Sequence, residues 1–383
     1  MVNRSPRSFS SKDVIDVHVH IAGPAGENQE MYFVSNEFKK SSSFEAIKLV
    51  TKLKEEEITG PRYVSVLFSQ VHESRHVDKA VLLALDAVYG EDGWLRREST
   101  HLYVANDYCA GLARIYPEFL FGCSVHPYAP DALERLWYCA RDGAVLCKWL
   151  PSAQCIDPTH PLAVRFYRAL ALLGLPLLMH VGPEETVPTA LSVTDELLFN
   201  AAAGRYGSHP GDGISLALEN GATVIVAHAA TPLGPLLDRH NEYWEQVFDL
   251  LMERVSTVAP DVPLYGDMSA FCLPGRFEYV AKVLPLAKKM PHRFLYGSDY
   301  PIPVISFRRR GLGALLDAFG WLAGRALPSN DFDKNYQLLR TRFPAETFIS
   351  AGRVLRAPDG PVPELDAYLR ALGVKRRRFI FFG

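Results

Sequence analysis

The stretch that decides the fold is VIDVHVH at 14–20, a mainly apolar run in which His18 and His20 stand two positions apart. Successive side chains of a β-strand point to opposite faces, so a spacing of two directs both imidazoles to the same face. Nearly continuous apolar character is typical of a strand that is buried on both faces of a parallel sheet. The stretch therefore predicts a buried parallel strand that brings two histidines to one point.

Seven further apolar runs follow, and stretches with helical periodicity separate most of them. The runs are 63–68 (YVSVLF), 119–125 (FLFGCSV), 144–150 (AVLCKWL), 175–181 (LPLLMHV), 223–229 (TVIVAHA), 263–269 (PLYGDMS) and 293–299 (RFLYGSD). Helices are expected at 131–141, 161–173, 235–255 and 275–289. Strands that alternate with helices indicate parallel β/α units. Eight such units predict an α/β fold, a (β/α)8 TIM barrel.

The chain of 383 residues is longer than a minimal barrel. We expect residues 1–12 to be a disordered or extended lead-in and residues 13–383 to be a single barrel domain. The barrel core is predicted at 13–305, followed by additional C-terminal helices at 306–383. Three long connections, at 23–60, 70–116 and 182–221, are expected to be rim insertions that shape a site.

Composition excludes several classes of protein. The 41 basic and 43 acidic side chains give a net charge of -2, and no basic surface for nucleic acid is expected. No run of 18 apolar residues is present, so we expect no membrane span. The six cysteines form no C-x-x-C pair, which favours reduced thiols in a cytoplasmic protein. A basic cluster and apolar tail at 375–382 are expected to pack on the barrel or to join a homo-oligomer.

Polar residues end several of the predicted strands. His180, His228 and Asp299 each follow an apolar run, and the carboxyl ends of all barrel strands share one rim. They would therefore meet His18 and His20 in space. Imidazole and carboxylate suit zinc, manganese or iron, and three or four protein ligands leave a position for water. The alternative is a set of hydrogen-bonded histidines at strand ends.

Seven motifs, in order along the chain, resemble the amidohydrolase superfamily, and most closely its amidohydrolase-related branch. That branch includes aminocarboxymuconate semialdehyde decarboxylase and several lactone and amide hydrolases. The resemblance covers about 13–305. It rests on DVHVH at 16–20, NDYCAGLARIYPEFLFGCSVHP at 106–127, GAVLCKWLP at 143–151, GLPLLMHVG at 174–182, VIVAHAA at 224–230, LYGDMSAF at 264–271 and LYGSDYP at 295–301.

The resemblance implies roles for the matching residues. His18, His20, His180 and Asp299 would hold a divalent metal, and His228 would be the catalytic imidazole. Asp299 could also accept the proton of a water molecule. The expected metal is zinc, with manganese or iron as alternatives.

Lys148 leaves the number of ions open. In binuclear relatives a lysine at this position is carbamylated and bridges two metals, whereas in the branch that this sequence most resembles it can stay unmodified. One ion is favoured, and two are expected if Lys148 is carbamylated. In either case Lys148 is expected to take part in catalysis.

The resemblance implies hydrolysis by metal-activated water of an amide, lactone or ester bond in a small-molecule substrate. His228 or Lys148 would polarise the carbonyl oxygen. The alternative is non-oxidative decarboxylation of an unsaturated or aromatic acid on the same metal site. The motifs do not separate the two reactions.

Four residues have a weaker claim to the site. Arg308 follows the eighth strand and could bind an acidic substrate, or it could belong to a solvated basic turn. His126 ends the third strand and could face the substrate or a neighbouring loop. Asp267 and Ser269 end the seventh strand, where they could support the site or simply be hydrogen-bonded.

Overall fold

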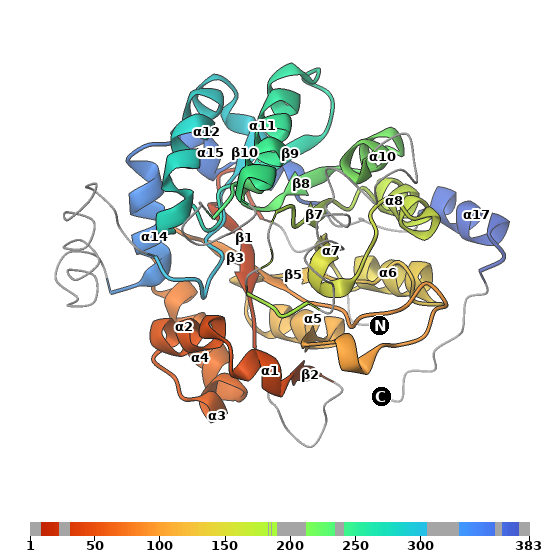
Figure 1. Ribbon diagram of the computed structural model, residues 1–383, viewed down its shortest axis with the longest axis horizontal. Helices are drawn as coiled ribbons and strands as arrows, with labels where there is room; N and C mark the ends of the chain where they lie inside the picture. Colours follow the sequence, from red (N-terminus) through yellow and green to blue (C-terminus); the bar gives the residue numbers. More distant parts are fainter. Residues whose placement is uncertain are drawn as a thin grey trace.

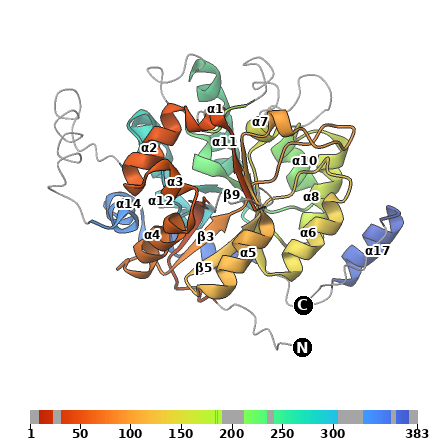
Figure 2. The same ribbon diagram turned by 90° about the horizontal axis from the view of Figure 1, so that it is seen from below.

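The computed structural model describes residues 9–22, 31–182, 184, 186–189, 212–233, 241–304, 329–356 and 362–374. The C-terminal tail at 375–383 and most of the lead-in lie outside the described residues. Eight parallel strands form one sheet, and helices surround it (Figures 1 and 2). In sheet order the strands are β1 (Ile15–His20), β3 (Lys79–Leu83), β5 (Phe119–Cys123), β6 (Ala144–Trp149), β7 (Leu177–Met179), β8 (Val224–Val226), β9 (Leu264–Asp267) and β10 (Phe294–Leu295). The predicted (β/α)8 barrel is confirmed.

The barrel closes where the segment after β10 pairs with β1. The backbone N–H of Val17 donates to the carbonyl of Tyr296 at 3.1 Å, and that of His20 donates to Tyr300 at 2.8 Å. Between them, the N–H of Asp299 donates to the carbonyl of His18 at 3.0 Å. Closure therefore brings the residues that follow the last strand beside the histidines of the first.

The second barrel strand is not the one that the sequence predicted. Residues 63–68 lie within helix α4 (Pro61–His72), and the second strand is β3, inside the connection that we expected at 70–116. Proline at the first helical position and burial of Tyr63, Val64, Leu67 and Val71, which share one helical face, explain the helix. The valine and aromatic content of YVSVLF was a misleading signal, because tertiary burial overrides strand propensity.

The four predicted helices are present in the described residues, while 235–240 of the third prediction lie outside them. They are α6 (Ala132–Arg141), α8 (Pro161–Leu173), α11 (Asn241–Thr257) and α12 (Phe277–Lys289). Helix α8 shows why the prediction worked, since it begins at a proline and ends before Gly174 with φ +62°. Further helices among the described residues are α5 (Asn106–Ile115) and α10 (Gly213–Glu219), and the short α7 (Pro151–Gln154) follows the carboxyl end of β6. No helix in the described residues is long and apolar enough to span a bilayer.

The connection after β1 forms a small layer over the rim. It contains β2 (Tyr32–Val34), α1 (Asn36–Lys39), α2 (Ser42–Thr51) and α3 (Glu55–Ile58), which lie together at one side of the barrel (Figure 1). The hydroxyls of Ser35 and Ser41 cap α1 and α2. Strand β2 pairs antiparallel with β4 (Leu102–Val104) from the connection after β3. The two insertions thus stabilise each other.

The barrel interior is closed at its amino end by the C-terminal segment. Ala351, Val354 and Leu355 join the cluster of inward-facing residues of the strands, such as Val17 and Ile225. The helices of this segment are α14 (Asp331–Arg340), α15 (Ala345–Phe348), α16 (Ala351–Val354) and α17 (Pro363–Ala371). The opposite, carboxyl end of the barrel is left for polar side chains.

Candidate active site

Three of the predicted metal ligands form a cluster at the carboxyl rim. The ligand atoms of His18, His20 and Asp299 all lie within 4.8 Å of one another. Oδ1 of Asp299 is 3.4 Å from Nε2 of His18 and 3.1 Å from Nε2 of His20. Two imidazoles and a carboxylate are a donor set that zinc, manganese and iron accept, so these residues fit a divalent ion.

Asp299 is held as a carboxylate within this cluster. Burial alone would raise its pKa, but His18, His20 and Arg276 outweigh burial and lower the pKa to about 2. Its backbone has φ +65°, an unfavourable conformation for a residue other than glycine. Strained backbone of this kind is typical of functional sites.

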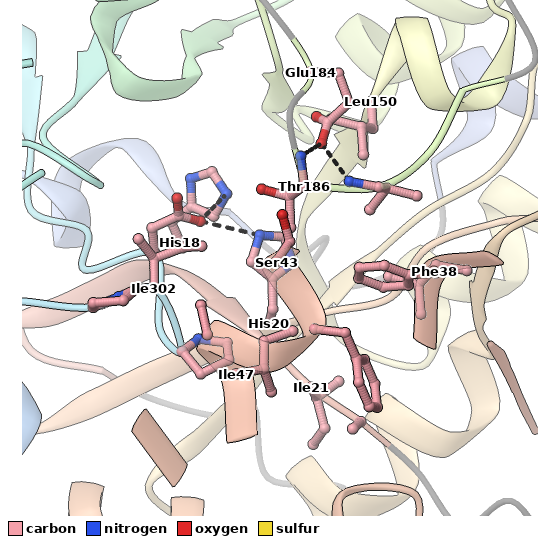
Figure 3. A pocket seen from close by; sticks show the side chains of 18 of the residues that line it. His18, His20, Ile21, Phe38, Ser43, Ile47, Leu150, Glu184, Thr186 and Ile302 are labelled. Atoms are coloured by element: carbon pink, nitrogen blue, oxygen red, sulfur yellow. Dashed lines mark hydrogen bonds and ion pairs between the residues drawn. The ribbon is translucent and has the colours of Figure 1, made fainter. Parts of the chain in front are cut away.

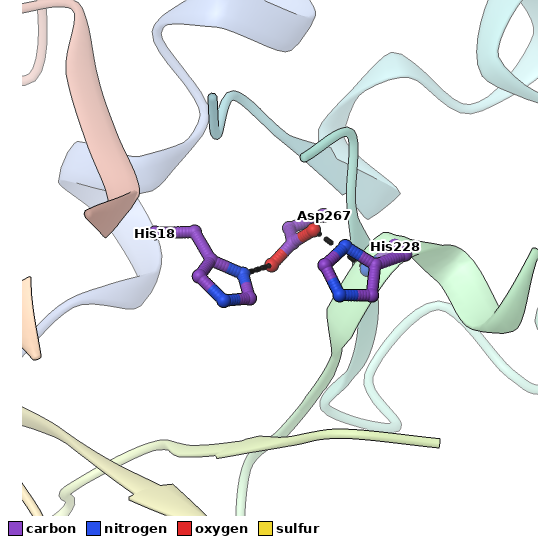
Figure 4. Close-up of side chains that lie close together, drawn as sticks. All are labelled: His18, His228 and Asp267. Carbon is purple, nitrogen blue, oxygen red and sulfur yellow. Dashed lines mark hydrogen bonds and ion pairs between the residues drawn. The ribbon is translucent and has the colours of Figure 1, made fainter. Parts of the chain in front are cut away.

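Asp267 orients His18 from behind. Its Oδ2 lies 2.8 Å from Nδ1 of His18 (Figure 4). Ser269 Oγ lies 3.0 Å from the same nitrogen. Burial by itself raises the pKa of Asp267, but the contact with His18 holds it below its ordinary value. The ionised carboxylate accepts the Nδ1 proton of His18, so the lone pair of Nε2 faces Asp299. A carboxylate behind a histidine is a common arrangement at metal sites.

His228 lies on the other side of the same carboxylate. Its backbone N–H donates to Oδ1 of Asp267 at 2.8 Å, and its ring stacks on that of His18 with centroids 5.1 Å apart (Figure 4). Its Nδ1 is 2.8 Å from Oγ and 3.2 Å from the carbonyl oxygen of Ser269. Because a carbonyl can only accept, Nδ1 carries the proton. Burial, and next the charge of Arg276, keep the pKa of His228 far below its ordinary value, so the ring is neutral.

Lys148 and His180 complete the polar residues that the sequence predicted. Lys148 is buried on β6, and its Nζ lies 3.2 Å from Nε2 of His18. Burial lowers the pKa of its amine. His180 follows β7, and its ring centroid is 5.2 Å from that of His228. His180 is not part of the three-residue cluster, and its Nε2 lies 3.8 Å from Oε2 of Glu184.

These side chains line one cavity of about 340 Å³, which is in the size range of small-molecule sites. Glu184 lies at one side, where its carboxylate accepts the backbone N–H groups of Thr186 and Val187 (Figure 3). The opposite side is apolar, and the insertion after β1 supplies most of it. Its residues include Ile21, Tyr32, Phe38, Phe44 and Ile47.

Comparison with known proteins identifies the family. The family model described as amidohydrolase matches residues 15–334. The chain belongs to the amidohydrolase family. A search of curated proteins finds no match to this sequence.

Solved structures of low identity resemble this amidohydrolase. One is described as a probable 2-pyrone-4,6-dicarboxylic acid hydrolase from Acinetobacter baumannii with citric acid bound, at 14% identity, TM-score 0.46, and coverage of 86% of this chain and 99% of that one. Another is an amidohydrolase from Burkholderia multivorans with bound HEPES, at 12% identity, TM-score 0.48, and coverage of 89% and 99%.

Arg276 is a cavity residue of this amidohydrolase that the sequence analysis missed. It is 5% exposed and ends a short 3-10 helix, Pro274–Arg276, in the connection between β9 and α12. Burial lowers its pKa to about 10, so the guanidinium stays charged at neutral pH. The signal that could have found it is its place in a rim loop after a barrel strand, within LPGR at 273–276.

Of the two predicted substrate contacts, one is not brought to the cavity and the other lies outside the described residues. His126 is fully buried in the barrel wall, with Nε2 2.8 Å from the carbonyl of Gln154 and Nδ1 accepting the N–H of Tyr128 at 3.2 Å. Both of its ring nitrogens are thus bonded within the protein. Arg308 lies outside the described residues.

Proposed function

We propose that this amidohydrolase is a metal-dependent hydrolase that cleaves a C–N or C–O bond, in an amide, lactone or ester, of a small molecule. The observation that carries the proposal is the cluster of His18, His20 and Asp299 beside His228 in one cavity. The family match supports hydrolysis as the reaction type.

His18, His20 and Asp299 would hold one divalent ion, with zinc as the first candidate and His180 as a further ligand from the same cavity. When bound, the ion supplies Lewis acidity and lowers the pKa of a water molecule toward neutrality. One ion is proposed, and a second would require carbamylation of Lys148. Asp267, the other buried carboxylate, is already committed to His18, Ser269 and the backbone of His228.

His228 is the proposed base of the reaction. Nδ1 of His228 keeps its proton and donates it in a hydrogen bond to Ser269. The lone pair of Nε2 is therefore free to accept the proton of an attacking water and to return it to the leaving group. The low pKa of the ring keeps that lone pair available at neutral pH. Asp299, with a pKa of about 2, is ionised before the reaction, and it is the alternative acceptor for the proton of the water.

Lys148 is the proposed electrophilic group. When its amine is protonated, Lys148 donates hydrogen bonds inside a buried site, where a hydrogen bond to developing negative charge is strong. The contact between Nζ and His18 places it at the edge of the ligand cluster. We therefore propose that Lys148 binds the carbonyl oxygen of the scissile bond.

The test combines elemental analysis with a substrate panel of amides, lactones, esters and aromatic carboxylic acids. We expect about one zinc per chain, and hydrolysis that stops on chelation and returns with added zinc. His20→Ala should lose both metal and hydrolysis. His126→Gln is the matched control, because it changes a strand-end histidine outside the cavity and should keep both. Hydrolysis that survives full metal removal would contradict the proposal. Carbon dioxide release without hydrolysis would instead establish the decarboxylase.

A further inference from the structure

We infer that the substrate carries a carboxylate and that the guanidinium of Arg276, which lines the cavity, binds it. This inference rests on the proposed function, since it names the class of substrate for that cavity. It starts from an unusual property of Arg276. The side chain is almost fully buried, yet in the described part of the chain it forms no ion pair.

The hydrogen bonds of Arg276 are incomplete. Among the described residues its only hydrogen bond runs from Nη1 to Oγ1 of Thr231, at 3.4 Å, and the buried Nε has no partner. Asp299, Asp267 and Glu184 attract the charge of Arg276, but its buried Nε–H has no acceptor among the described residues. A buried N–H group without an acceptor is costly, so a protein keeps one where a ligand completes it. The free edge of a guanidinium presents two parallel N–H groups, which match the two oxygens of a carboxylate.

A second buried arginine, Arg293, also has a buried Nε without a partner among the described residues, but its terminal nitrogens are satisfied inside the protein. Arg293 donates to the carbonyls of Val262, Leu264 and Ala259 near the amino end of β9. Arg276 follows the carboxyl end of the same strand and finds no such set of carbonyls. The difference indicates that Arg276 is kept for something that enters the cavity.

The position of Arg276 is suited to substrate binding. Thr231, its partner, donates its hydroxyl to the carbonyl of His228 at 2.8 Å, so the guanidinium is tied to the segment that carries the proposed base. A carboxylate at Arg276 would anchor the substrate near His228. The apolar side of the cavity, which includes Phe38 and Ile47, would take an uncharged body. The substrate class is therefore a small carboxylic acid with an apolar body.

The experiment measures the binding of benzoate, benzamide and phenyl phosphate by calorimetry. It is carried out with the zinc-bound protein and with protein from which a chelator has removed the zinc. The chelated form matters because a carboxylate can also bind a metal. We expect Arg276→Met to weaken benzoate binding at least 10-fold in both forms while benzamide binding stays unchanged. Lys282→Met is the matched control, because it removes an exposed cation of the neighbouring helix α12 and should leave all three ligands unaffected.

Circular dichroism and thermal unfolding establish that each variant is folded. Should Arg276→Met fail to fold, Arg276→Lys keeps the charge but loses the two-pronged edge, and benzoate binding should still weaken several-fold. Equal benzoate affinity in wild type and a folded Arg276 variant would overturn the inference, as would tighter binding of phenyl phosphate than of benzoate. Binding does not require turnover, so this result is independent of whether hydrolysis depends on metal.

Discussion

Two parts of the barrel rim carry polar side chains at strand ends, and they serve different purposes. The cavity side, after β1, β8 and β10, presents His18, His20, His228 and Asp299 to one open space. The packed side, after β3 and β5, holds Asp86 and His126 in bonds within the protein, although Asp86 and Arg135 also line a second cavity of about 470 Å³. In sequence the two look alike, since each has polar residues that follow an apolar run.

The packed side is a closed network of hydrogen bonds. Asp86 pairs with Arg135 at 2.8 Å and accepts the backbone N–H groups of Ala87 and His126. Gln154 donates from Nε2 to the carbonyl of Asp86 and accepts the N–H of Leu150. These groups satisfy one another. Polar residues at a strand end therefore form a site only where their hydrogen-bonding groups remain available to a ligand.

The largest effect is expected from breaking the packed side. Asp86→Ala leaves Arg135 and two backbone N–H groups without their buried acceptor, so the free energy of unfolding should fall by about 4 kcal/mol. Urea denaturation measures this loss. Hydrolysis per folded molecule should be retained. Asp299→Asn is the counterpart, and it should abolish hydrolysis while changing stability less than Asp86→Ala does. A reversed pattern would remove the distinction between the two sides.

A smaller effect is expected from His228→Ala on the cavity side. Turnover should fall by about 100-fold, the usual range for an acid-base group, and metal content should stay near normal because His228 is not a proposed ligand. Steady-state kinetics and elemental analysis check the two parts. Unimpaired turnover would exclude His228 from the mechanism, and loss of the metal would make it a ligand instead.

The smallest expected effect is the contribution of His126 to the pH dependence of stability. Burial lowers its pKa to about 4 from an ordinary value of 6.5. Between pH 4 and pH 6.5 His126 binds a proton in the unfolded chain but not in the folded chain. The free energy of unfolding therefore decreases as pH falls from 6.5 toward 4. From pH 7 to pH 5 the loss should be about 2 kcal/mol. His126→Gln should lack this part of the acid dependence, as denaturation at both pH values would reveal. An identical pH dependence in the two proteins would mean that His126 is protonated in the folded state.

Much of the fold could be predicted from the sequence, because seven of the eight barrel strands are buried on both faces and show continuous apolar runs. The second strand could not. Its segment at 79–83, KAVLL, is short and lies within a long connection, whereas 63–68 has stronger β-propensity but lies in an amphipathic helix. Propensity describes a local preference, and packing of one helical face against the barrel overrides it.

Of the candidate site, the cluster of His18, His20 and Asp299 was predicted because it depends only on strand ends and barrel closure. Arg276 was not, because a loop residue has no periodicity to indicate where it points. His126 was placed among possible substrate contacts on the same signal as His228. Its backbone partners come from Gln154 and Tyr128, and neither contact is visible from spacing.

The sequence by itself determined that strands alternate with helices and which polar residues stand at the ends of strands, since periodicity and burial are local properties. Only the tertiary structure decided which of those residues share a cavity and which satisfy each other inside the wall. The physical reason is that a buried polar group takes whichever partner the fold brings within hydrogen-bond distance. His18 finds Asp267, 249 positions away, and Arg276 finds only one weak partner.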